Sequence, residues 1–100
     1  MEQDSKKQKL SQFIVDYLEI LHDCLNYTNF AEDRLNFKAS IVNVSFWLVD
    51  LKTKSFAEVS QVILDSQTDK LILDSWKSGE WGEKEAIGLT TLQKNIRSIV

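Results

Sequence analysis

The residues best suited to chemistry lie in the first third of the chain, where Glu19 and His22 form a Glu-x-x-His pair. Bundle proteins that bind two iron atoms use two such pairs, together with two further glutamates on facing helices. The chain contains a single histidine, so the second pair is missing. We therefore interpret His22 as an exposed helical histidine, and we expect neither a metal site nor another cofactor.

The single cysteine, Cys24, is the candidate nucleophile. A nucleophilic thiol needs a neighbouring base and an exposed, electropositive setting. His22 lies two residues away on the same predicted helix and therefore points in another direction. Cys24 falls among the apolar residues of that helix, which predicts a buried, unreactive thiol. The sequence also lacks a glycine-rich phosphate loop after a strand, so we expect no enzyme activity.

Acidic residues form the clearest charge pattern in the sequence. No Lys or Arg occurs between Leu10 and Ala31, although an exposed helix usually pairs an acidic residue with a basic one four positions away. Two interpretations remain open. The acidic residues form a docking face for a basic protein, or they form a helix face that is solvated by water or ion-paired with a lysine of another helix. The candidate partner-binding acids are Asp16, Glu19, Asp23, Glu32 and Asp33.

Trp81 is a further candidate for contact with a partner. It lies in a predicted loop over residues 78–83, flanked by Glu80 and Glu83, and tryptophan is over-represented among residues that anchor protein interfaces. The alternative is that the indole folds back over the end of the helices, since its burial is strongly favourable.

Composition favours one folded domain and argues against binding to nucleic acid or membranes. The chain has 100 residues, of which 43% are hydrophobic, and a formal net charge of −3. Binding to nucleic acid needs a basic stripe, and a membrane-surface helix needs basic residues on its polar face. The polar start carries no apolar signal core, and one cysteine allows no internal disulfide, so we expect a cytoplasmic protein.

The elements that carry these residues are predicted to be helices, because the chain has no proline and only three glycines, too few turn-forming residues for many short strands. Ser55 and Glu58 match a capping box, which marks a helix start. Gly88, inside the last helix, predicts that a neighbour approaches closely there. An irregular start over 1–9 is followed by predicted helices over 9–28, 35–51, 56–65, 70–77 and 83–100.

The helix from Leu35 to Leu51 is the centre of the predicted fold, because two apolar stripes run along its opposite sides. The first stripe is Leu35, Ala39, Val42, Phe46 and Val49, and the second stripe is Phe37, Ile41, Val44, Leu48 and Leu51. A helix that is apolar on two sides needs cover on both. The predicted fold is therefore all-α, a bundle of four or five helices around this helix, in one domain over 10–100.

The competing fold is α+β, with a strand within residues 37–49, since this segment is rich in β-branched and aromatic residues. The helix is favoured because the two stripes persist for about five turns, which is long for a strand.

These observations predict a small, acidic, non-enzymatic protein-binding domain. Its most concrete form is an inhibitor that covers a basic partner, as an immunity protein or antitoxin neutralises a toxin such as a nuclease. The alternative is a structural subunit or adaptor that forms homo- or hetero-oligomers through apolar surface such as Trp81 or the second stripe. A third hypothesis is a metal-binding or enzymatic bundle that uses Glu19, His22 and Asp23.

Overall fold

In the computed structural model, every described element is an α-helix. The structure describes residues 2–28, 31–66 and 83–100, with only the backbone for 2–4 and 83–86. The all-α fold is confirmed, and residues 37–49 are helical rather than extended. The helix predicted over 70–77 lies outside the described residues, as does the loop over 78–83 apart from its last residue. The helices are α1 (Glu2–Tyr27), α2 (Ala31–Thr53), α3 (Phe56–Asp65) and α5 (Glu83–Ile99).

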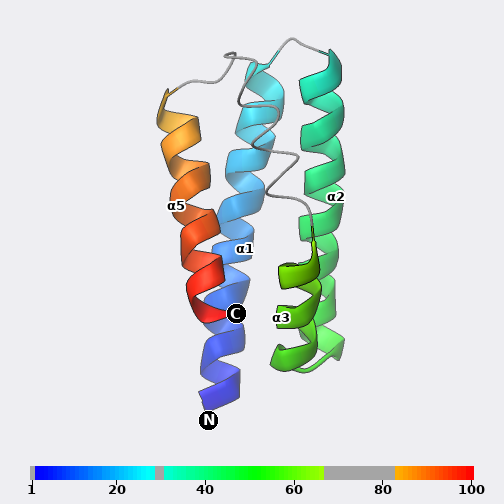
Figure 1. Cartoon of the computed structure of the whole chain (residues 1–100), viewed down its shortest axis with the longest axis vertical. Helices are drawn as coiled ribbons and strands as arrows, with labels where there is room; N and C mark the ends of the chain where they lie inside the picture. Colours follow the sequence, from blue (N-terminus) through cyan, green and yellow to red (C-terminus); the bar gives the residue numbers. More distant parts are fainter. Residues whose placement is uncertain (1, 29–30, 67–82) are drawn as a thin grey trace.

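Helix α1 lies in the middle of the bundle and packs against α2, α3 and α5 (Figure 1). The chain direction alternates, so that α1 is antiparallel to both α2 and α5, and α3 runs back along the second half of α2. The central position therefore belongs to α1, whereas the sequence placed α2 there. Helix α1 also begins at Glu2 instead of near Lys9, because the glutamate, glutamine and lysine residues that open the chain are good helix formers.

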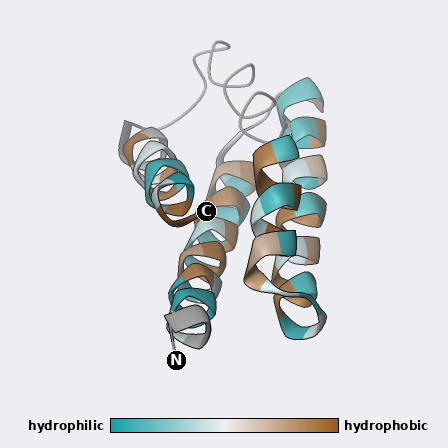
Figure 2. Ribbon diagram, turned by 60° about the horizontal axis from the view of Figure 1, so that its bottom comes forward, coloured by the Kyte–Doolittle hydropathy of each residue, from teal (hydrophilic) through white to brown (hydrophobic). Residues whose placement is uncertain are grey.

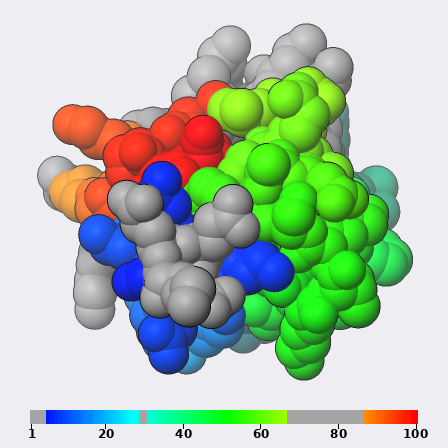
Figure 3. Space-filling model, turned by 90° about the horizontal axis from the view of Figure 1, so that it is seen from below, coloured from blue at the N-terminus to red at the C-terminus, as the bar shows by residue number. Residues whose placement is uncertain are grey.

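The core contains one aromatic or aliphatic side chain from each helix at the same level of the bundle. Tyr17, Trp47, Ile63 and Ile96 line an internal gap of about 10 Å³, which is far smaller than a ligand cavity. The Gln93 amide donates a hydrogen bond to the Tyr17 hydroxyl over 3.1 Å, so the phenol at the edge of the core has a partner. Seen from the end where α1 begins, the last turn of α5 lies beside α3 (Figure 3).

Two serines form local hydrogen bonds within α2 and at the start of α3. Ser40 is fully buried on α2, and its hydroxyl donates to the Asn36 carbonyl over 2.9 Å, which satisfies the hydroxyl without a partner from another helix. Ser55 caps α3, since its Oγ accepts from the Glu58 N–H over 3.2 Å and donates to the Glu58 carboxylate over 3.1 Å. The predicted helix start is confirmed.

The corner between α1 and α2 is held by Arg34. Its Nη1 donates to the carbonyl oxygens of Leu25 and Thr28, over 2.8 and 3.2 Å. Leu25 lies in the last turn of α1 and Thr28 directly follows the helix, so Arg34 lies at the end of α1, where backbone acceptors lack helical partners and the helix dipole favours a cation. The interaction was not foreseen because Arg34 belongs to the next helix in sequence.

We expect Arg34→Ala to lower the free energy of unfolding by about 1.5–3 kcal/mol, the usual value for hydrogen bonds to a charged group. Urea unfolding followed by circular dichroism gives the change, provided that the denaturant slope is unchanged. Lys38→Ala, which changes an exposed residue one turn later, is the control. Equal stabilities of the two variants would show that Arg34 does not hold the corner.

The close approach predicted at Gly88 is confirmed, because a Cβ atom placed there would lie 2.9 Å from Cδ1 of Ile20 on α1. Alanine favours the helix over glycine by about 1 kcal/mol, but the Ile20 methyl must move to admit it. Ile20→Val removes that methyl. We expect Gly88→Ala to be more stabilising by at least about 0.5 kcal/mol in the Ile20→Val background than alone, measured as a double-mutant cycle. Additive effects would contradict this contact.

Candidate protein-binding surfaces

The acidic side of α1 faces away from the core. Glu19 and Asp23 are exposed, and Asp16 is half-buried. The Asp16 carboxylate accepts a hydrogen bond from the Gln12 amide over 3.0 Å, one turn earlier on the same helix. Lys54 and Asp50 form an ion pair over 3.6 Å, whereas Asp16, Glu19 and Asp23 have no basic partner within 4 Å in the part of the chain that the structure describes.

The two acids that open α2 differ from each other. Glu32 is exposed, but Asp33 is only 4% exposed, so its side chain does not lie on the surface that the prediction of partner binding requires. Adjacent residues of a helix point about 100° apart, and Asp33 shares its side of α2 with the buried Phe37 and Ser40. A carboxylate is tolerated there because the first turn of a helix offers free N–H groups and a positive dipole end. Trp81 lies outside the described residues.

The candidate catalytic residues do not form a site. His22 is exposed, whereas Cys24 is a free thiol that is only 3% exposed, so the prediction of a buried cysteine is confirmed. In the part of the chain that the structure describes, no three His, Cys, Asp or Glu side chains lie close enough together to hold a metal ion.

The first stripe of α2 is uncovered. The exposed fractions are 67% for Leu35, 53% for Val42, 61% for Phe46 and 55% for Val49, and Ala39 is exposed as well. The expectation that both stripes are covered is therefore wrong for this side of the helix. The stripe lies on the side of α2 opposite the residues that face α1, and Figure 2 shows hydrophobic segments recurring along the whole helix.

The second stripe is the covered one. Phe37, Val44 and Leu51 are buried, and Ile41 and Leu48 pack against the core as partly buried side chains. The second stripe is therefore no surface for an oligomer contact, contrary to the sequence-based alternative. One side of α2 therefore packs against the core, and the opposite side is exposed.

A groove extends the first stripe towards α3. Phe46 forms one wall and Val62, which is 38% exposed, forms the other. The groove is open and has a volume of about 420 Å³, large enough for a side chain of another protein. Its remaining lining residues are Asn43, Trp47, Asp65 and Ser66.

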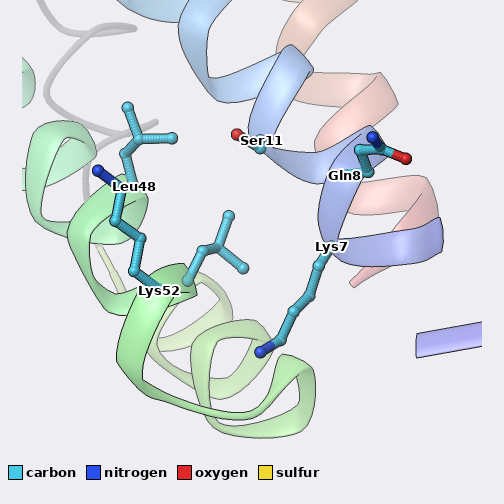
Figure 4. Close-up of a pocket in the computed structure, with 6 residues that line it drawn as sticks. Lys7, Gln8, Ser11, Leu48 and Lys52 are labelled. Atoms are coloured by element: carbon cyan, nitrogen blue, oxygen red, sulfur yellow. The ribbon is translucent and has the colours of Figure 1, made fainter. Parts of the chain in front are cut away.

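A second open pocket, of about 410 Å³, lies between the first turns of α1 and the last turns of α2 and is lined partly by Lys7, Ser11 and Lys52. In Figure 4 the side chains of Lys7 and Lys52 extend in different directions. Small-ligand sites place a few polar groups so that they converge on one ligand. The two ammonium groups do not converge, so the pocket lacks the geometry of an anion site.

The described residues include no helix long and apolar enough to cross a membrane. In comparisons with known proteins, no family model matches the chain, and no curated protein or solved structure matches it either.

Proposed function

We propose that this chain is a non-enzymatic protein-binding domain that binds its partner through the first stripe of α2. The observation that carries the proposal is a line of four large apolar side chains that are each more than half exposed. Single exposed apolar residues are common, but a contiguous apolar patch on a folded domain marks an interaction site.

The shape of the surface indicates what binds to it. The stripe spans roughly 20 Å from Leu35 to Val49, at about 1.5 Å per residue. Anchors spaced by three and four residues along one helix are the pattern with which a helix lies against a groove or against another helix. Because full burial of one such side chain contributes about 1.5–3 kcal/mol, covering the exposed halves of four of them supplies a driving force for association.

We expect Phe46→Glu to abolish partner binding while leaving the fold intact, since Phe46 is 61% exposed. Capture of host-cell proteins on the immobilised variants, followed by quantitative mass spectrometry, tests this. Ile87→Glu is the matched control, because Ile87 is an apolar side chain on α5 with 59% exposure. Proteins retained equally by both variants would contradict the proposal.

A second candidate function is supported by the exposure of Glu19 and Asp23 and by the absence of a described basic neighbour. In this alternative the chain is a cytoplasmic inhibitor. The acidic side of α1 binds a basic protein and covers it, as an inhibitor covers a toxin such as a nuclease. Complementary charge then raises the association rate and selects the partner.

The triple variant Asp16→Lys/Glu19→Lys/Asp23→Lys tests this alternative. We expect an unchanged circular dichroism spectrum, since these side chains face away from the core, and loss of a basic partner that wild type retains at low salt and releases at high salt. The neutral triple variant Asp16→Asn/Glu19→Gln/Asp23→Asn should give an intermediate loss. Retention by the lysine variant would exclude the acidic side of α1 as the docking face.

A further inference from the structure

We infer that the partner of the first stripe is a second copy of this chain, with the two α2 helices paired in parallel. The inference rests on the proposed function and specifies its partner. Both stripes of α2 step alternately by four and three residues, the 3.5-residue average with which two helices keep one seam in contact. The second stripe already packs against the core formed with α1, so the first stripe has the spacing to pack along another helix.

The two edges of the first stripe carry opposite charge. At about 100° per residue, Lys38 and Lys52 lie along one edge, and Glu32 and Asp50 lie along the other, where Lys54 forms an ion pair with Asp50 over 3.6 Å. Lys38, Lys52 and Glu32 are exposed, and the Asp50 side chain is 22% exposed. Asp65 of α3 lines the groove beside the stripe and adds to the acidic edge. Lys54 offsets the charge of Asp50, so Glu32 and Asp65 give this edge its net negative charge. A surface with one basic and one acidic edge is complementary to a copy of itself.

The charges also determine the orientation of the pair. When two identical helices run parallel about a two-fold axis, each edge faces the opposite edge of the other copy. The basic edge of each copy then faces the acidic edge of the other. In an antiparallel pair each edge faces itself, which places the edge with Lys38 and Lys52 of one copy beside the same basic edge of the other. Like charges across a contact disfavour that arrangement.

The size of the contact sets the expected strength. The first stripe, its two edges and Val62 amount to about a dozen residues per copy, fewer than the roughly 20–30 residues per side of a stable interface. We therefore expect a dimer that forms reversibly as the protein concentration rises, with a dissociation constant in the micromolar range.

Sedimentation equilibrium of the full chain over a range of about 1–500 µM tests the partner. Wild type and Ile87→Glu should show the same monomer–dimer equilibrium, whereas Phe46→Glu and Val42→Glu should remain monomeric at every concentration. Agreement between the two stripe variants shows that the effect belongs to the stripe and not to one substitution. Their circular dichroism spectra report whether each variant is folded. Dimers of both stripe variants at wild-type strength would place the contact elsewhere and overturn the inference.

Crosslinking tests the orientation. Cysteines are introduced singly at the two ends of the stripe, as Leu35→Cys and Val49→Cys, in a Cys24→Ala background. In a parallel pair, equal residues face each other, so each variant should form a disulfide with itself on oxidation. In an antiparallel pair the two ends lie roughly 20 Å apart, so disulfides would form only when the two variants are mixed, and that outcome overturns the parallel arrangement.

Failure of this inference is distinguishable from failure of the proposed function. A wild-type chain that is monomeric throughout the concentration range excludes the second copy as partner. The proposed function survives that result if host-cell capture still separates Phe46→Glu from Ile87→Glu. If the two variants also capture the same proteins, the first stripe is no binding surface and both proposals fail.

Discussion

The fold depends on one geometric constraint, namely that a helix with two apolar sides can turn only one of them towards a given neighbour. In α2 the second stripe packs into the core, and its buried members include Phe37, Val44 and Leu51. α3 then packs next to α2 near Trp47 and Ile63, not across the outer side of the helix. The outward stripe is left with Leu35 and Phe46 more than 60% exposed, although removing such surface from water is favourable.

Helix α1 takes the central place because its apolar residues occupy a broad face that serves several neighbours at once. Tyr17 meets α2, α3 and α5 around the same internal gap, while Ile20 lies against the helix backbone of α5 at Gly88. The opposite side of α1 then has no helix to contact among the described elements, which is why Glu19 and Asp23 remain in solvent. The acidic surface and the first stripe are both consequences of which side each helix turns inward.

The fold class and most helix boundaries could be predicted, because apolar spacing and the Ser55 cap are local properties of the sequence. The close contact at Gly88 could also be predicted, since a helical glycine needs a packing reason. The sequence does not predict which stripe of α2 is covered. Both stripes have the same spacing, and the choice depends on how α2 packs against α1. For the same reason the sequence does not predict the burial of Asp33, because the side of α2 that faces the core is determined by tertiary packing.

An exposed apolar stripe carries a risk of indiscriminate association, so its edges matter as much as its centre. Exposed ion pairs contribute little to affinity, typically below about 1 kcal/mol each. Their effect lies in the difference between competing arrangements, because an antiparallel orientation places the two basic edges, each with Lys38 and Lys52, beside each other. The apolar side chains thus provide the attraction, and the charged edges restrict it to one orientation and one kind of partner. Because the acidic side of α1 and the stripe of α2 face different directions, one surface can be occupied while the other stays free.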